Sequence, residues 1–406
     1  MTSPVPYRIR VPTSTLRDLR TRLATTRWPQ PLPVPAWQAG TDAAWLQHLV
    51  DYWRDIFDWA TQEESINRFQ HFRAEIDGLG LHFIHERGLG PEPLPLLLLH
   101  GWPDSFLRMA KIIPLLSDPA AHGGDPADAF DVVVPSLPGF GFSDAPRTPM
   151  DATAIADLLA TLMGRELGYR HYAVHGGDLG SSVAEMLARR HAKALVGVHL
   201  TEVPYWHLLQ RPADTLSPAE REYLAAGQRW QMREGAYALL QSTRPQTLAY
   251  ALNDSPVGLA AWICEKFRAW SDCDGDIERC YTKDELLTHV TLYWVTQSIG
   301  SSFLPYYAAM QQAPAGNGTR AEVPAALALF PRDLVNAPRE YAERVFDLQR
   351  YTVMPRGGHF AALEQPDLLV EDIREFFRPL RAAAHTSWPQ AIAALTRGAR
   401  RSPNNP

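Results

Sequence analysis

The stretch Val174-His175-Gly176-Gly177-Asp178-Leu179-Gly180-Ser181 decides how this chain of 406 residues is interpreted. It joins a short apolar run to a helical pattern through Gly-x-Asp-x-Gly, which is the form of a nucleophile elbow. In such an elbow the central residue lies on a strained turn, and small residues two before and two after it let neighbouring backbones approach. Gly176 and Gly180 occupy those two positions, so Asp178 is the candidate nucleophile. Taken alone, the same Asp could simply cap the helix that follows.

Two later residues favour the catalytic interpretation. In hydrolases built on a parallel sheet, the chain order is nucleophile, then acid, then histidine. Asp333 follows an expected strand at 325–330, and His359 follows the next expected strand at 349–354. Because the carboxyl ends of parallel strands meet at one edge of an open sheet, Asp178, Asp333 and His359 are predicted to converge there.

A turn upstream supplies the expected oxyanion hole. Leu99-His100-Gly101-Trp102-Pro103 ends the first strongly apolar strand, where this architecture places half of that hole. The predicted donors are the backbone N–H groups of Trp102 and Leu179. Gly and Pro would also suit an ordinary tight turn, but the match of this turn together with the elbow, the acid and the histidine favours the oxyanion hole.

Short apolar runs alternate with helical periodicity around the elbow, which is typical of βαβ units and an open parallel sheet. Between about residues 204 and 318 the strand signals stop, and helical patterns with many aromatic residues take over. We therefore predict an α/β-hydrolase fold, with a mostly parallel sheet, helices on both faces and a helical cap insertion. The first block, with no strand pattern, is expected to pack on something larger. The predicted organisation is an N-terminal helical and meander lobe at 1–71, the core at 72–204 and 321–381, the cap at 205–320 and a flexible tail at 382–406.

Composition narrows the classes of partner. The chain has 39 Lys and Arg against 45 Asp and Glu, so no basic stripe is available to follow phosphates, and nucleic acid is not an expected partner. Three cysteines without C-x-x-C spacing support neither a disulfide framework nor a zinc site, and no metal or organic cofactor is expected. No secretory signal is visible, and no run approaches the ~18 apolar residues of a membrane span. A soluble cytoplasmic protein is expected, and a homodimer is a possible oligomeric state.

An Asp nucleophile restricts the reaction more than the fold does. The chain contains no Gly-x-Ser-x-Gly, and a carboxylate can displace a leaving group at a saturated carbon to give an ester that water, activated by His359, would cleave. Opening an epoxide needs an acidic O–H, ideally two tyrosines, whereas expelling a halide needs indole or amide N–H donors. Physical arguments alone do not choose among the eight tyrosines of the cap. A dehalogenase and a non-catalytic ligand-binding protein on the same scaffold therefore remain alternatives.

The chain resembles the microsomal-type epoxide hydrolases, which include the juvenile hormone epoxide hydrolases of insects and many bacterial relatives. The resemblance runs from about residue 5 to residue 380. It rests on YRIRVP at 7–12, TRWP at 26–29, HGWP at 100–103, PGFGFSD at 138–144, GGDLGS at 176–181, ALNDSPVGLAAWI at 251–263 and RGGHFAALEQP at 356–366. It implies an epoxide hydrolase that turns a small-molecule epoxide and water into a vicinal diol, and the aromatic-rich cap suggests that this epoxide is apolar.

Residue by residue, the resemblance implies that Asp178 is the nucleophile, His359 the base and Asp333 the acid. The two ring-opening tyrosines match Tyr237 and Tyr306.

Three departures from the family pattern limit which properties of the family are expected of this chain. Relatives commonly have Arg and Glu around the second tyrosine, where this chain has Leu304 and Ala308, so Tyr307 remains an alternative to Tyr306. The mammalian members carry an N-terminal membrane anchor that is not seen here, so membrane attachment is not implied. Similar dehalogenases generally have Trp directly after the nucleophile, and Leu179 at that position disfavours halide release.

Overall fold

The computed structural model describes residues 4–311 and 320–381, so the tail at 382–406 lies outside the described residues. Within the described ranges nine strands form one sheet in the order β1-β2-β3-β5-β4-β6-β7-β8-β9. The strands are β1 Val5–Pro6, β2 His71–Ile76, β3 Leu79–Glu86, β4 Leu94–Leu99, β5 Phe130–Pro135, β6 Tyr172–Gly176, β7 Leu195–Leu200, β8 Ala321–Leu329 and β9 Phe346–Val353.

The sheet is parallel from β5 to β9, and β3, β2 and β1 extend it antiparallel at one edge. The strands β4 to β7 are almost wholly buried, as expected for parallel strands covered on both faces. The block from residue 7 to about residue 70 holds no strand, as expected, but the strand β1 just before it was not predicted: its Val5 and Pro6 pair with Arg73 and Phe72. Two residues are too few to show a period, and their pairing depends on partners more than sixty residues away.

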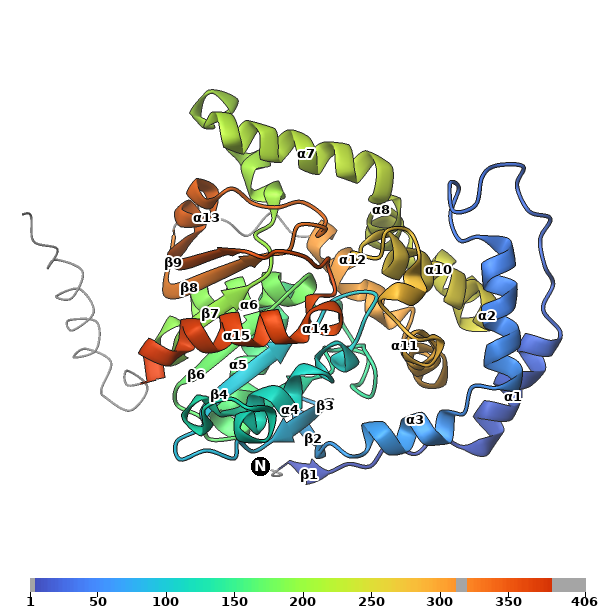
Figure 1. Cartoon of the computed structure of the whole chain (residues 1–406), viewed down its shortest axis with the longest axis horizontal. Coiled ribbons are helices and arrows are strands. Elements are labelled where there is room, and N and C mark those ends of the chain that lie inside the picture. The colour runs from blue at the N-terminus through green and yellow to red at the C-terminus, as the bar shows by residue number, and fades with distance from the viewer. Residues whose placement is uncertain (1–3, 312–319, 382–406) are drawn as a thin grey trace, which may run out of the picture.

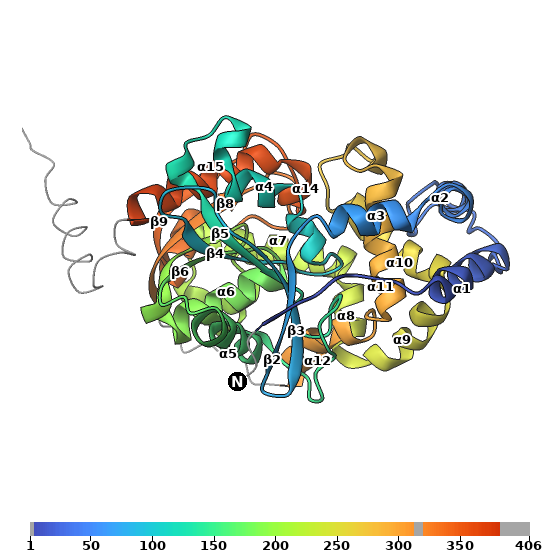
Figure 2. The same ribbon diagram turned by 90° about the horizontal axis from the view of Figure 1, so that it is seen from below.

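Helices cover both faces of the sheet (Figure 2). Helices α4 (Ile112–Ser117) and α15 (Pro366–Phe377) lie on one face, and α5 (Ala152–Thr161) and α6 (Leu179–Arg190) lie on the other. Asp151 caps α5 by accepting a hydrogen bond from the Ala154 N–H. Two shorter helices, α13 (Arg339–Val345) and α14 (Ala361–Glu364), flank β9 in the chain. This arrangement confirms the predicted layers.

The cap is inserted between β7 and β8 and consists of six α-helices in the described residues. Proline at the first helical position begins three of them, where its missing N–H costs nothing. The helix α11 begins instead at a Thr282–Glu285 capping box. The cap helices are α7 Pro218–Glu234, α8 Ala236–Thr243, α9 Pro245–Asp254, α10 Pro256–Ala269, α11 Lys283–Thr296 and α12 Leu304–Gln311.

The N-terminal helices pack on the cap rather than on the sheet (Figure 1). They are α1 (Thr13–Ala24), α2 (Ala43–Asp55) and α3 (Trp59–Ile66). The indole N–H of Trp53 donates to Thr291 of α11 at 3.0 Å, and Thr41 donates to the carbonyl of Ala261 in α10 at 2.7 Å. The lobe therefore supports two cap helices from outside.

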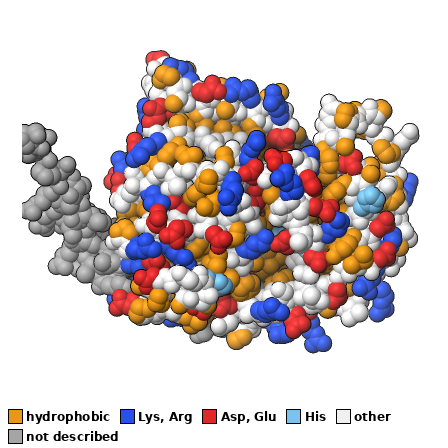
Figure 3. All heavy atoms as spheres, in the orientation of Figure 1, with side chains coloured by type: hydrophobic (Ala, Val, Ile, Leu, Met, Phe, Trp, Pro, Cys, Tyr) orange, Lys and Arg blue, Asp and Glu red, His pale blue; other side chains and the backbone are white. Residues whose placement is uncertain are grey.

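The surface carries both signs of charge. On the face shown in Figure 3, acidic and basic side chains are interspersed rather than gathered by sign. None of the helices within the described residues is long and apolar enough to cross a membrane.

Candidate active site

Asp178 lies on a sharp turn between β6 and α6, as the elbow motif predicts. Its φ of 55° is in the left-handed region, which a residue with a side chain rarely adopts. A Cβ on Gly176 would lie 2.4 Å from the carbonyl oxygen of Gly180, and a Cβ on Gly180 would lie 2.3 Å from that of Leu99. Both glycines are therefore required by close backbone approach.

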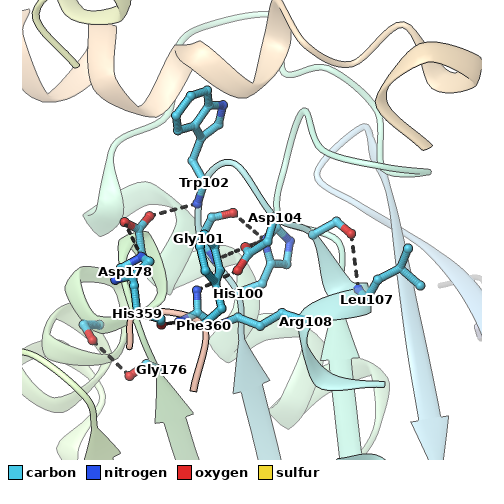
Figure 4. Close-up of polar contacts among 12 residues, drawn as sticks. His100, Gly101, Trp102, Asp104, Leu107, Arg108, Gly176, Asp178, His359 and Phe360 are labelled. Carbon is cyan, nitrogen blue, oxygen red and sulfur yellow. Dashed lines mark hydrogen bonds and ion pairs between the residues drawn. The ribbon is translucent and has the colours of Figure 1, made fainter. Parts of the chain in front are cut away.

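The Asp178 carboxylate is held by backbone donors. Its Oδ1 accepts a hydrogen bond of 2.8 Å from the Trp102 N–H, and the Leu179 N–H also donates to the carboxylate. These are the two donors predicted for the oxyanion hole. The carboxylate makes no N-cap hydrogen bond to the N–H groups beyond Leu179 in the first turn of α6, so the simple helix-cap interpretation is not supported. In Figure 4 the Trp102 indole points away from Asp178, while its backbone N–H points toward it.

The structure brings Asp333 and His359 to the same edge of the sheet as Asp178. His359 Nε2 lies 3.3 Å from Asp178 Oδ2, and His359 Nδ1 lies 2.7 Å from Asp333 Oδ1. Asp333 Oδ1 also accepts a hydrogen bond from the Leu334 N–H at 2.7 Å. All three side chains are largely buried, with His359 only 1% exposed. The imidazole therefore lies between two carboxylates, as a nucleophile–base–acid set requires.

The charges of this set depend on one another. Burial alone would lower the pKa of His359, but the Asp333 charge and the contacts with Asp178 and Asp333 raise it to about 10. Burial alone would raise the pKa of Asp178, but His359 and the backbone donors bring it below its ordinary value. The resting site is therefore an ion pair. Neutralising Asp178 would lower the pKa of His359.

The loop that carries His359 is fixed by a half-buried acid that no sequence motif marked. Glu364 of α14 accepts hydrogen bonds from the N–H groups of Gly358 at 3.0 Å and Phe360 at 2.9 Å. The His359 N–H donates to the carbonyl of Trp270 in the cap at 2.8 Å. These contacts hold the backbone on both sides of the histidine.

A buried ion pair, also missed from the sequence, joins the His359 loop to the turn with the oxyanion donor. Arg108 lies in the short helix η1 (Phe106–Met109) and donates to Asp104 Oδ2 at 2.6 Å and to the carbonyl of His359. Asp104 Oδ1 in turn accepts from the Gly101 N–H at 3.0 Å (Figure 4). Arg108 is therefore a cross-link between the two loops that shape the site.

Tyr237 of α8 and Tyr306 of α12 lie together beside Trp102. The Tyr237 ring stacks on the Trp102 ring at 5.0 Å between centroids, and the two tyrosine rings are 6.1 Å apart. Burial first, and then the nearby Asp178 charge, raises the pKa of Tyr237 well above its ordinary value. A hydrogen bond links the two side chains. The structure thus places both predicted tyrosines near the candidate nucleophile.

Several other cap tyrosines are engaged elsewhere. Tyr293 donates to the carbonyl of Asp104 at 2.7 Å, and Tyr223 donates to the carbonyl of Val203. Tyr250 is 72% exposed. The hydrogen bonds of Tyr293 and Tyr223 and the exposure of Tyr250 distinguish these three tyrosines from the pair beside Trp102.

Glu202 is a further acid at the site, and no sequence motif marked it. It follows β7 by two residues, and one side-chain donor atom each from Glu202, Asp333 and His359 lie within 4.8 Å of one another. Three such side chains could in principle hold a metal ion. Because Asp333 and His359 already share a hydrogen bond of 2.7 Å, the geometry fits a proton-handling group better than a metal centre.

Comparisons with known proteins agree with this geometry. Residues 4–109 match the family described as "Epoxide hydrolase N terminus", and residues 95–261 match that described as "alpha/beta hydrolase fold". Epoxide hydrolase 1 of Sus scrofa is 35% identical over 404 residues, covering 91% of this chain and 88% of that protein.

Two solved structures extend the agreement to the whole fold. The Aspergillus niger epoxide hydrolase superimposes with a TM-score of 0.80 at 31% identity, covering 93% of this chain and 97% of that one. The juvenile hormone epoxide hydrolase of Bombyx mori gives 0.83 at 28% identity, covering 94% and 96%. The predicted α/β-hydrolase fold with an N-terminal lobe is confirmed.

Proposed function

The chain belongs to the microsomal-type epoxide hydrolase family and is an epoxide hydrolase, and on that premise we propose that it acts in two steps through a covalent ester of Asp178. The observation that carries this mechanism is the placement of two tyrosine hydroxyls and one carboxylate on the same site. An epoxide oxygen leaves as an alkoxide and needs an O–H acid, whereas a halide would need N–H donors.

In the first step, Asp178 attacks a ring carbon and the bond from that carbon to the epoxide oxygen breaks. The oxygen takes a proton from Tyr237 or Tyr306, leaving a tyrosinate. The hydrogen bond between the two tyrosines lets the second stabilise the charge on the first. The product is a neutral ester between Asp178 and the opened substrate.

In the second step, water attacks the ester carbonyl. Ester formation removes the Asp178 charge that helps keep His359 protonated, so the ring passes its proton to the tyrosinate, which restores the tyrosine, and the neutral ring can act as the base. The Trp102 and Leu179 N–H groups hold the oxyanion of the tetrahedral intermediate. One hydrogen of the water goes through His359 to the departing diol oxygen, and the other, left on the Asp178 carboxyl group, passes to His359 and restores the ion pair.

We further propose that the substrate is a small apolar epoxide. The Tyr237 ring lies between those of Trp102, at 5.0 Å, and Trp270, at 5.2 Å. The Phe303 ring packs on that of Trp102 at 6.3 Å. Such aromatic walls favour a hydrocarbon body and leave recognition of the oxygen to the hydroxyls. Water is the second reactant.

Single-turnover mixing with styrene oxide tests the mechanism. The ester should accumulate in His359→Gln, where intact mass should show an adduct of substrate mass, and should be absent in Asp178→Ala. Absence of both adduct and diol across aryl, alkyl and terpenoid epoxides would overturn the proposal.

A further inference from the structure

Glu202 and Asp333 approach the same histidine from neighbouring strands. Strands β7 and β8 are paired and parallel, so residues just beyond their carboxyl ends emerge side by side. Glu202 follows β7 and Asp333 follows β8, and their carboxyl groups and a ring nitrogen of His359 lie within 4.8 Å of one another. His359 therefore has two carboxyl neighbours besides the nucleophile.

The backbone around Glu202 is held firmly. Tyr223 of the cap donates to the carbonyl of Val203, and Tyr341 donates to that of Pro204 at 2.6 Å. The Thr201 N–H donates to the carbonyl of Gly176 beside the elbow at 3.3 Å. Hydrogen bonds of the backbone on both sides of Glu202 thus fix the position of its Cα.

One oxygen of Asp333 is free to receive a further proton donor. Asp333 Oδ1 accepts from both His359 and Leu334, whereas the buried Oδ2 has no hydrogen-bond partner. A buried carboxylate oxygen without a donor is costly. A neutral carboxylic acid nearby, directly or through one water, would satisfy it.

The charges around Glu202 favour its neutral form. Burial first, and then the charges of Asp178 and Asp333, raises the pKa of Glu202 to about 8. Two carboxyl groups this close share a proton more readily than both ionise. The titratable and charged groups that act on Glu202 or are acted on by it are Asp178 after β6, Asp333 after β8, His359 after β9, Arg108 of η1, Tyr223 of α7 and Tyr237 of α8.

We propose that Glu202 is a positioning residue for His359, which as a neutral acid donates toward the free oxygen of Asp333 and ionises to support the imidazolium when Asp333 is neutralised. The two carboxyls then present one negative charge to the ring in either case. This inference rests on the proposed two-step mechanism and adds to it a second acid.

A double-mutant cycle on ester hydrolysis tests the proposal. The four proteins are wild type, Glu202→Gln, Asp333→Asn and the double variant, and the decay of the ester is followed by intact mass after a single turnover. Glu202→Gln should slow decay about threefold in the wild type and by about tenfold or more in Asp333→Asn, because coupled neighbours are not additive. Equal factors in both backgrounds would overturn the proposal.

Infrared difference spectra supply a readout independent of turnover. Wild type minus Glu202→Gln at neutral pH should show the C=O band of a protonated carboxylic acid, and a carboxylate band alone would overturn the proposal. This measurement stands even where Asp333→Asn fails to fold. Glu86→Gln is the matched control, since burial also raises the pKa of Glu86 but this residue pairs with Val132 of β5, three residues before the carboxyl end of that strand. It should leave both the decay rate and the Glu202 band unchanged.

These outcomes distinguish a failure of the proposed two-step mechanism from a failure of the role proposed for Glu202. Failure of the wild type to form any ester would overturn the proposed mechanism, while the infrared band would still report whether Glu202 is protonated. Normal ester formation with no coupling between Glu202 and Asp333 would overturn the role of Glu202 alone.

Discussion

His359 Nδ1 and Asp333 Oδ1 lie 2.7 Å apart, although 26 residues separate them in the chain. Each side chain follows a strand of one parallel pair, β8 and β9, and an isolated bridge between Arg332 and Gly358 continues that pairing beyond the strands. The sheet register itself therefore sets the contact between base and acid, and loop packing only refines it.

The two tyrosines should act in ring opening. Tyr237→Phe or Tyr306→Phe should each lower the rate of ester formation by about tenfold, and the double variant by about 10³-fold or more, because a general acid contributes ~10²–10⁴-fold. Stopped-flow fluorescence with intact-mass sampling measures that rate. Tyr307→Phe is the matched control, and a loss for Tyr307→Phe with none for Tyr306→Phe would show that the second acid is Tyr307.

Arg108 should matter for both stability and the second step. Arg108→Met leaves Asp104 buried and unpaired, so the free energy of unfolding should fall by about 3–5 kcal/mol. Ester hydrolysis should slow more than ester formation, since the carbonyl of His359 loses its donor. Urea unfolding and single-turnover decay measure the two effects.

A surface arginine provides the comparison for Arg108. Arg54 pairs with Asp55 where the two side chains are 34% and 55% exposed, so Arg54→Met should leave the free energy of unfolding almost unchanged. Similar losses for the two arginine variants would contradict the assignment of Arg108 as a cross-link.

Gly180 should tolerate no side chain. In Gly180→Ala the new Cβ would lie 2.3 Å from the carbonyl oxygen of Leu99, and such overpacking should destabilise the fold by about 1–3 kcal/mol. Gly164→Ala, where no heavy atom lies within 4 Å of the new Cβ, should be neutral or stabilising. Thermal unfolding compares the two, and an unchanged Tm for Gly180→Ala would refute the close approach.

Stability should depend on pH through His359. Its pKa is raised from 6.5 to about 10 on folding, so protonation stabilises the folded chain fully below about pH 6.5, and this contribution is lost as the pH rises through about 10. The excess stability of wild type over His359→Gln should therefore shrink between these limits. Urea unfolding across that range measures the difference, and an excess that grew with pH would have the wrong sign.

Much of the fold was predictable because its signals are local. The buried runs that became β4 to β7 and the glycines around Asp178 are contiguous patterns, and chain order then identified Asp333 and His359. The strand β1 was missed because two residues carry no period and pair with β2 across the N-terminal lobe. The cap was predicted only as a helical region, and the structure divides it into separate helices at positions such as Gly235, where α7 ends, and Gln297, where α11 ends.

The sequence by itself determined the family and indicated the candidate nucleophile, acid and base, since each of these rests on a short motif of residues adjacent in the chain. Only the tertiary structure decided that Arg108 joins two loops, that Glu202 lies beside Asp333, and that Tyr237 and Tyr306 meet next to Trp102. Those relationships arise from the alignment of parallel strand ends and the packing of the cap over them. Contacts of that kind leave no spacing in the sequence by which they could be recognised.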